Sequence, residues 1–216
     1  MPTDDWPFLY LRSPHMPRHY LPFLLGVVLL GLVPLLLLPR AERRVRWPFF
    51  LLGMGFFLVE TGNILGLSLL FGSTWVVKAL VFCGVLLLVL MGNATVHLWR
   101  RRLLLWPAIG ALLASLAAAY FTPVSALLGV EPTALRLAAT VAVFLGPVYF
   151  ASVVFATLIR DEQNLAQAYG SNILGAVVGG ACEYLSLLFG FKVLQGLVIA
   201  VCATMIWAVV RARRTS

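Results

Sequence analysis

Charged residues are scarce in this sequence. Aspartate, glutamate, lysine and arginine together make up 11% of its 216 residues, whereas 62% of the residues are hydrophobic. The mean hydropathy is +0.98. A soluble globular domain of this length requires more polar surface than this composition supplies, so that class is excluded. Long apolar runs in such a chain are typical of a multi-pass integral membrane protein.

Cysteine and histidine are scarce too, with three residues of each type. All three cysteines fall inside apolar runs without metal-ligand spacing, which predicts small, buried hydrophobic side chains. They are Cys83, Cys182 and Cys202. His15 and His19 stand at helical spacing in a proline-rich segment, but neither they nor His97 have a third ligand beside them. We therefore expect no metal and no cofactor.

Motifs of catalysis are missing from the sequence. No glycine-rich phosphate or nucleotide loop follows a strand, because no segment is predicted to be a strand. Adjacent carboxylates occur at Asp4-Asp5 and at Asp161-Glu162, both in polar segments where solvated side chains are expected. With no nucleophile–base pair and no metal ligands, we expect a chain that is not itself an enzyme.

Seven apolar runs divide the chain, and each is long enough, at ~1.5 Å per helical residue, to cross a hydrocarbon core of ~30 Å. Helices are favoured over strands because every run exceeds the length of a strand. The predicted helices cover residues 20–38, 47–71, 75–99, 103–121, 135–159, 165–189 and 193–210. The sequence thus predicts an all-α, polytopic membrane helix bundle over residues 20–210. An N-terminal interfacial or loop segment (1–19) precedes it, and a basic C-terminal tail (211–216) follows.

The basic residues cluster between the apolar runs, so the net charge of +8 is better explained by membrane topology than by binding to nucleic acid. With seven spans, the loops at 40–46 and 100–102, Arg160 and the C-terminal tail share one face of the membrane. That face holds eleven of the sixteen lysines and arginines, and the other face holds five. The positive-inside rule then predicts that the N-terminus is outside and the C-terminus inside.

An acidic residue, Glu60, lies near the middle of the second predicted helix and is followed by Thr61 and Asn63. An ionisable side chain at this depth is costly, so it should face protein or water and not lipid. Lys78, near the outer end of the third helix, differs from Glu60 in depth by ~9 Å, which predicts a coupling between the two side chains. The alternative is that Glu60 is a protonated or hydrogen-bonded structural carboxyl.

The sixth predicted helix has the most polar face. Residues at three- and four-residue spacing share one stripe of that helix. They are Tyr169, Asn172, Ala176, Gly179 and Glu183. We expect this stripe to face the protein interior, with Asn172 and Glu183 completing a candidate intramembrane polar site that also contains Glu60, Thr61, Asn63 and Lys78.

Two pairs of glycines, each four residues apart, allow close approach of helix backbones. Gly62 and Gly66 belong to the second predicted helix, and Gly175 and Gly179 belong to the sixth. We expect helix packing at these four positions.

Four stretches of the sequence together resemble the membrane portion of bacterial fused spermidine-synthase-like proteins, which join an aminopropyltransferase-like domain to transmembrane helices. The stretches are TDDWPFLY (3–10), FFLVET (56–61), LLFGSTWVV (69–77) and YGSNILGAVVGGACEYLSLLFG (169–190). Because the family's S-adenosylmethionine-type nucleotide site is absent from this chain, the resemblance implies the membrane part without the enzyme. It also implies a location in the bacterial inner (cytoplasmic) membrane. The chain departs from the family at two positions. It has Gly62 where a basic residue is frequent, and it has Lys78 where an asparagine is frequent.

Two functions are therefore open. The first is a non-catalytic membrane module that anchors or associates with a partner, such as a separate aminopropyltransferase-like protein, a larger complex or a second copy of itself. The second is a small transporter or channel for a polar or cationic solute such as a polyamine, with Glu60 and Glu183 as intramembrane sites.

Overall fold

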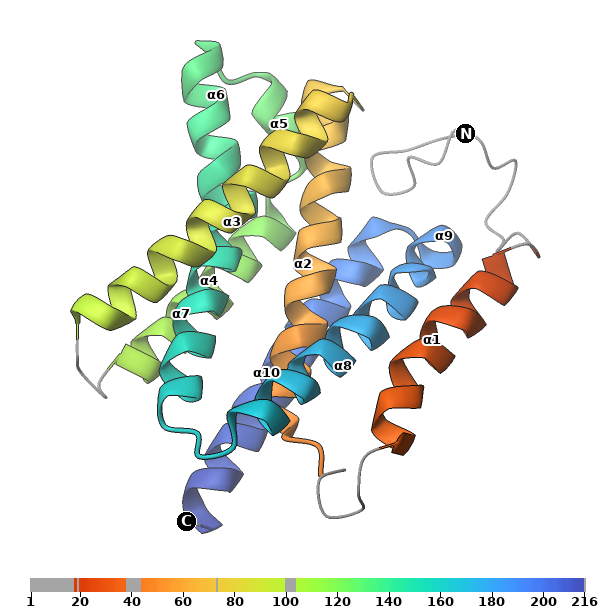
Figure 1. Cartoon of the computed structure of the whole chain (residues 1–216). Coiled ribbons are helices and arrows are strands. Elements are labelled where there is room, and N and C mark those ends of the chain that lie inside the picture. The colour runs from red at the N-terminus through yellow and green to blue at the C-terminus, as the bar shows by residue number, and fades with distance from the viewer. Residues whose placement is uncertain (1–17, 19, 38–43, 73, 100–103, 216) are drawn as a thin grey trace. The chain divides into compact units, whose positions relative to one another are not determined.

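The computed structural model of the chain describes residues 18, 20–37, 44–72, 74–99 and 104–215. Within these ranges the regular structure is helical and no strand occurs, which confirms the all-α class (Figure 1). Apart from Arg18, the predicted N-terminal segment lies outside the described residues, as do the arginines at 40, 43 and 100–102. The elements are α1 (Tyr20–Leu37), α2 (Trp47–Phe71), α3 (Trp75–Leu98), α4 (Leu105–Phe121), α5 (Val124–Leu128), α6 (Thr133–Thr140), the π-helical segment η2 (Val141–Leu145), α7 (Gly146–Arg160), α8 (Leu165–Glu183), α9 (Leu185–Phe189) and α10 (Phe191–Thr215).

Five helical stretches are long and apolar enough to cross a membrane. They are Trp47–Ser68, Trp75–Leu98, Ala134–Arg160, Leu165–Phe189 and Lys192–Arg211. The first and fourth predicted spans appear as shorter apolar helices, Tyr20–Val33 and Leu105–Phe121. Five such helices suggest a multi-pass membrane protein. The count of seven spans and the orientation of the termini stay predictions.

Three element boundaries differ from the predicted spans. The fifth span is interrupted by η2, directly before the first turn of α7, which contains Pro147. Proline lacks an amide N–H and clashes with the preceding helical turn, and a π-helical turn accommodates that defect. The sixth span is divided at Tyr184 into α8 and α9. The last helix continues to Thr215, so residues expected in the basic tail belong to α10.

The chain forms two compact units. One combines Met1–Leu58 with Glu162–Ser216, and the other is Val59–Asp161. Helix α2 therefore contributes its first half to one unit and its second half to the other. Gly72, at the end of α2, has a φ of 90°, a left-handed conformation that side chains other than glycine rarely adopt.

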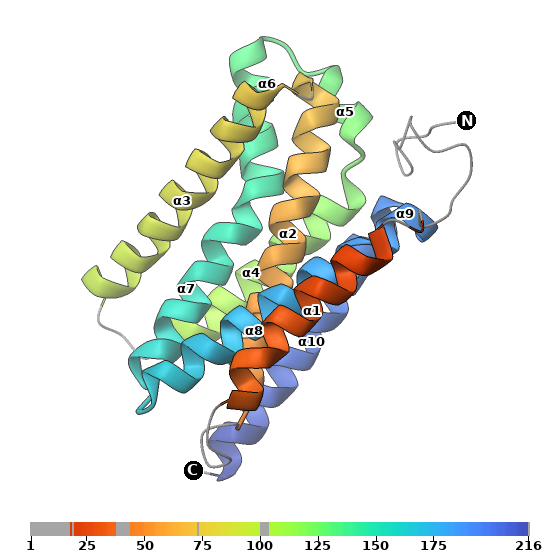
Figure 2. The ribbon, with the colours of Figure 1, turned by 45° about the vertical axis from the view of Figure 1, so that its right-hand side comes forward.

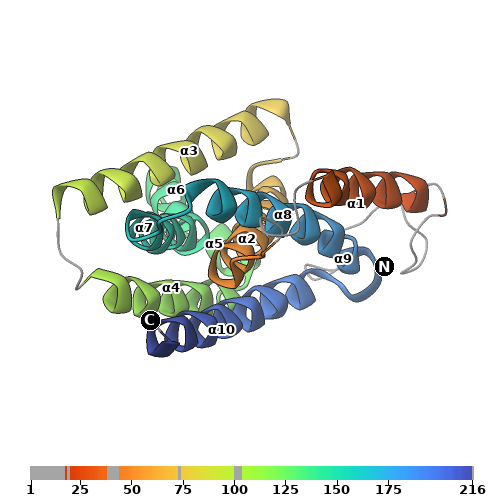
Figure 3. The same cartoon turned by 60° about the horizontal axis from the view of Figure 1, so that its bottom comes forward.

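In the Val59–Asp161 unit, α7 packs against α3 and α4 and lies between them (Figure 3). The buried face of α3 carries Val81, Val85, Gly92 and Val96 at helical spacing. Most other residues of α3 are exposed, and many of these are large and apolar, with Leu86 68% and Leu90 64% exposed. Large apolar side chains on the outside of a long apolar helix fit contact with lipid.

A close contact between α3 and α7 is at Gly92. A Cβ atom at this position would collide with Oγ of Ser152 and lie 3.2 Å from the carbonyl oxygen of Tyr149. One turn further along α3, Oγ1 of Thr95 lies 2.9 Å from the hydroxyl oxygen of Tyr149, close enough for a hydrogen bond in either direction. The two helices are thus joined by a small-residue contact and a side-chain hydrogen bond.

In the other unit, α1 lies along α8 (Figure 2). The rings of Tyr20 and Tyr184 are 5.7 Å apart at one end of this contact. Further along, a Cβ at Gly31 would lie 2.8 Å from Cγ1 of Val177. Helix α10 buries Leu194, Val198 and Met205 along one face.

The cysteines are not all buried as expected. Cys202 is buried in α10, Cys182 is partly buried, and Cys83 is exposed. The expectation for Cys83 is wrong because it lies on the face of α3 that turns away from Val81 and Val85. An apolar run identifies a membrane helix, but it does not indicate which of its faces meets protein and which meets lipid.

Candidate functional site

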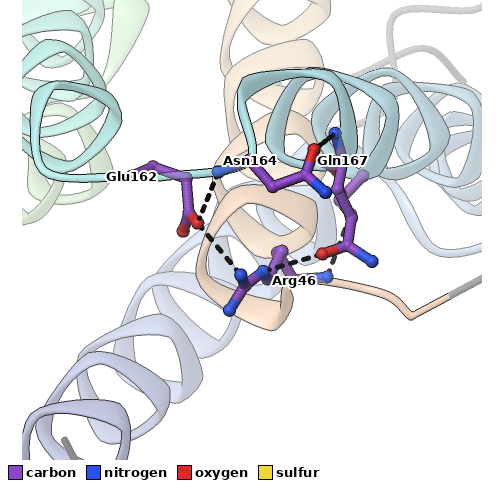
Figure 4. Close-up of polar contacts among 5 residues, drawn as sticks. Arg46, Glu162, Asn164 and Gln167 are labelled. Carbon is purple, nitrogen blue, oxygen red and sulfur yellow. Dashed lines mark hydrogen bonds and ion pairs between the residues drawn. The ribbon is translucent and has the colours of Figure 1, made fainter. Parts of the chain in front are cut away.

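A polar cluster joins the start of α2 to the start of α8 (Figure 4). Arg46, directly before α2, has its Nη2 atom 3.0 Å from Oε1 of Glu162. Its Nε donates a hydrogen bond to Oε1 of Gln167 at 3.0 Å, and its backbone N–H donates to Oγ of Ser171 at 2.9 Å. We call these residues, together with Asn164, the Arg46 clamp.

Local sequence explains how the clamp residues of α8 are positioned. Asn164 is the N-cap residue, and its side-chain oxygen accepts a hydrogen bond from the backbone N–H of Gln167 at 3.0 Å. The backbone N–H of Asn164 donates to Oε1 of Glu162 at 3.3 Å. Gln167 and Ser171 are four residues apart and share one face of α8. The cap therefore aligns both side chains with Arg46.

The guanidinium group of Arg46 remains accessible despite its partners. Its side chain is 44% exposed, whereas that of Glu162 is 15% exposed. The nearby Arg44 is exposed, and Arg211 near the end of α10 lies 5.2 Å from the ring centre of Trp207. The starts of α2 and α8 and the C-terminal part of α10 lie at the same end of this unit (Figures 1 and 2). That end therefore presents arginines, one of them held in a defined geometry.

Beyond the clamp, α8 crosses the first half of α2 at backbone contact. A Cβ at Gly175 would collide with the carbonyl oxygen of Phe50, and one at Gly179 would lie 2.7 Å from the carbonyl oxygen of Met54. Both glycines are buried. The backbone of α2 therefore lies against both Gly175 and Gly179, as the four-residue spacing of these glycines predicts.

Two further residues contribute to this crossing. A Cβ at Gly53 would collide with the carbonyl oxygen of Asn172. The side-chain Nδ2 of Asn172 donates a hydrogen bond to the carbonyl oxygen of Phe49 at 3.1 Å. Asn172 thus links α8 to α2 through a hydrogen bond that its side-chain amide donates within the protein.

The glycine pair in the second half of α2 behaves differently. Gly62 and Gly66 are both buried. A Cβ at Gly66, however, would have no heavy atom within 4 Å. The close approach expected at Gly66 is therefore absent, and open space lies beside this residue.

The candidate polar residues of α2 are buried to different degrees. Glu60 is half-buried, Thr61 is 8% exposed and Asn63 is 4% exposed. Nδ2 of Asn63 is buried without a hydrogen-bond partner. Buried side-chain amides are normally paired, so this donor needs an explanation.

Lys78 is exposed in the first turn of α3. Within the part of the chain that the structure describes, no ion pair joins it to Glu60. Glu60 and Lys78 therefore form no direct ion pair, although their predicted depths in the membrane would allow one. A long lysine stem near a helix end can place its ammonium group in the interface without a partner.

The stripe on α8 is only partly internal. Gly179 is buried and Asn172 is half-buried, but Tyr169 is 49% exposed. Glu183, the last residue of α8, is half-buried and has an interaction partner. The six candidate polar residues divide between the units, since Glu60, Thr61, Asn63 and Lys78 belong to Val59–Asp161. Asn172 and Glu183 belong to the other unit, and a single site formed by all six residues stays a prediction.

Sequence reasoning missed the Arg46 clamp. The sequence places Arg46 in a basic loop and predicts a solvated side chain at Glu162. An asparagine three residues before a glutamine is a sequence signature of a helix start, and it marks the beginning of α8. Nothing local connects that start with Arg46, because packing of distant helices brings them together.

Metal binding finds no support in the described ranges, which contain no group of three histidine, cysteine, aspartate or glutamate residues that could hold an ion. His15 and His19 lie outside those ranges.

Comparison of the chain with protein-family models, with curated proteins and with solved structures finds no match. The class that the fold indicates is a multi-pass helical membrane protein, and the resemblance to spermidine-synthase-like fusion proteins stays a prediction.

Proposed function

We propose that the chain is a non-catalytic module of the bacterial inner membrane that holds a partner protein at the membrane surface. The observation that carries this proposal is the Arg46 clamp. A loop arginine fixed by Glu162 and Gln167, with its guanidinium still accessible, offers a preorganised contact at the end of a membrane unit. The positive-inside rule assigns this end to the cytoplasm.

The arginines at this end favour a partner with an acidic surface, because opposite charges attract across an interface. Arg44, Arg46 and Arg211 lie at this end, and the whole chain carries a net charge of +8. An acidic protein surface would be attracted to such an end and oriented by it. The resemblance described above favours an aminopropyltransferase-like protein, and a larger membrane complex or a second copy of the chain would make similar use of the surface.

Copurification tests this proposal. The chain is isolated in mild detergent, and the proteins that accompany it are identified by mass spectrometry and quantified for Arg44→Glu and for Lys192→Glu. Both substitutions change the charge equally, but Lys192 is exposed at the opposite end of α10 from Arg211. We expect only Arg44→Glu to lose the partner. Equal loss in both variants, or no stoichiometric partner, would contradict the proposal.

A second candidate function is passage of a polar solute through the bundle. The unpaired Nδ2 of the buried Asn63 supports it, because polar groups inside membrane helices mark solute and ion pathways. The purified chain in liposomes should then conduct a polar solute by itself, and Asn63→Leu should reduce the flux. Liposomes that remain tight to amines, polyols and monovalent ions would count against this candidate.

A further inference from the structure

Helix α3 carries a polar residue on its exposed surface. Asn93 is exposed, and within the part of the chain that the structure describes its side-chain amide has no hydrogen-bond partner. The helix is long and apolar enough to cross a membrane over Trp75–Leu98. Asn93 lies six residues before Trp99, so it is ~9 Å inside the level of this exposed tryptophan. An amide at that position meets hydrocarbon unless another protein surface covers it.

Contact with lipid is unfavourable for this amide. Hydrocarbon offers it neither a donor nor an acceptor, and an amide in such surroundings is costly without a hydrogen bond. Tryptophan is enriched at membrane interfaces, so Trp75 and Trp99 mark the two ends of the span. The asparagine side chain, in contrast to a lysine stem, is too short to reach either end. Asn93 therefore requires a hydrogen-bonding partner within the membrane.

Exposed residues continue along α3 on both sides of Asn93, at alternating spacings of four and three residues. We call them the α3 seam. The six residues, all exposed, are Ala79, Cys83, Leu86, Leu90, Asn93 and His97. A heptad repeat of this kind is the pattern by which helices pack in a left-handed coiled coil. From its first to its last residue the seam extends over ~27 Å, most of the thickness of a hydrocarbon core.

The α3 seam lies away from the helices of its own unit. Packing against α7 uses the buried face of α3, which contains Val85 and Gly92. At 3.6 residues per turn, the centre of the seam is about 140° around the helix from the centre of that face. No charged residue lies between Ala79 and Asn93, so two seams side by side would bring no like charges together over this length. The seam is therefore available to another helix.

We propose that the α3 seam is the interface of a parallel homodimer, in which two copies of this chain pack their seams together across a two-fold axis along the membrane normal. Copies inserted with the same topology hold their α3 helices parallel, so each seam residue meets its own counterpart. An asparagine amide contains both a donor and an acceptor, so two Asn93 side chains satisfy each other. This reciprocity selects a second copy as the occupant. The interface contains no residue of the Arg46 clamp and does not depend on the proposed partner protein.

Cysteine crosslinking in membranes tests the seam. Cys182→Ala and Cys202→Ala leave Cys83 as the only cysteine, and oxidation with copper phenanthroline should then join two copies. In a chain without its native cysteines, Leu90→Cys should crosslink. Met91→Cys, the matched control, should not, because it is exposed next to Leu90 but lies off the seam. Equal yields at positions 90 and 91, or no crosslink at positions 83 and 90, would overturn the proposal.

Dilution in lipid tests the role of Asn93. Chains with a donor or an acceptor fluorophore on a C-terminal tag are reconstituted in liposomes at a series of protein-to-lipid ratios, and energy transfer gives the dissociation constant of the dimer. Asn93→Leu should raise this constant about three- to tenfold, as expected for an interhelical hydrogen bond in a membrane. Asn93→Gln, which keeps the donor and the acceptor, should raise it less, and Met91→Ala should leave it unchanged. Energy transfer no greater than that of randomly mixed monomers, or a constant that Asn93→Leu does not change, would overturn the proposal.

Discussion

The guanidinium group of Arg46 lies 3.0 Å from the carboxylate of Glu162. Arg46 directly precedes α2 and Glu162 precedes α8, so the pair joins segments that are far apart in the sequence. Gln167 and Ser171 accept two further hydrogen bonds from Arg46. The start of one membrane helix is thereby tied to the start of another.

The first prediction concerns this clamp. Arg46→Met and Glu162→Gln should each lower the free energy of unfolding, and the double variant should lose less than the sum of the two. Because Arg46 is partly exposed, we expect a coupling of about 0.2–1 kcal/mol. Thermal unfolding of the four proteins in one detergent measures it. Arg44→Met, which removes an exposed arginine next to the clamp, should have a smaller effect than Arg46→Met.

The second prediction concerns the crossing of α2 and α8. In Gly175→Ala the new methyl group would collide with the carbonyl oxygen of Phe50, so the helices must separate. We expect a loss of about 1–3 kcal/mol in stability. Gly170→Ala in the same helix is the matched control, since Gly170 has no heavy atom within 4 Å of a Cβ. Calorimetry or thermal unfolding that ranked Gly170→Ala as the more harmful change would contradict the observed crossing.

The third prediction concerns α3 and α7. Gly92→Ala should destabilise the Val59–Asp161 unit, because the added methyl group would collide with Oγ of Ser152. Removing that hydroxyl in Gly92→Ala/Ser152→Ala should recover part of the loss. Recovery should be incomplete because Cβ of Ser152 is also only 3.1 Å away. Chemical unfolding of the wild type, both single variants and the double variant provides the comparison.

The fourth prediction concerns Glu60 and Lys78, which form no direct ion pair although a coupling between them was expected. With Lys78 exposed and no ion pair between the two side chains, the effects of Glu60→Gln and Lys78→Met on stability should add. Agreement within about 0.3–0.5 kcal/mol is typical of independent sites. A clear coupling energy in the double-mutant cycle would mean that a bridging water or side chain joins them.

The fifth prediction is the orientation of the chain. Eleven of the sixteen basic residues fall in the segments that alternate onto one face if all seven apolar runs cross. A cysteine introduced at position 3 should then react with an impermeant reagent added from outside, and one at position 216 should not. Reaction at both positions would require an even number of spans, and the opposite pattern would reverse the orientation.

The glycine pairs show how far a local motif reaches. The same spacing occurs at Gly62/Gly66 and at Gly175/Gly179, but a backbone contact is found at the second pair and open space beside Gly66. A small residue permits close approach without requiring it. Whether a neighbouring helix packs against the small residue depends on how the helices are arranged. Gly53, which completes the crossing of α2 with α8, carried no recognisable motif.

Polar residues show the same division. Glu60 and Asn63 could be singled out because polar side chains are rare and costly in apolar runs. Their lack of hydrogen-bond partners could not be anticipated, because neighbouring elements decide which polar groups find a partner. Arg46 is the converse case, since its two side-chain partners lie in and just before α8 and its role follows from packing alone.

By itself, the sequence determined the all-α class and the positions of the apolar helices, because helix formation and transfer into a membrane depend on residues that are neighbours in the chain. The tertiary structure alone decided which face of α3 is buried, where α8 meets α2, and which of the polar residues are paired. Those outcomes depend on contacts between segments that are distant in the sequence, and hydrophobicity is nearly uniform around these helices. A helix that is apolar on all sides carries no pattern from which its neighbours can be read.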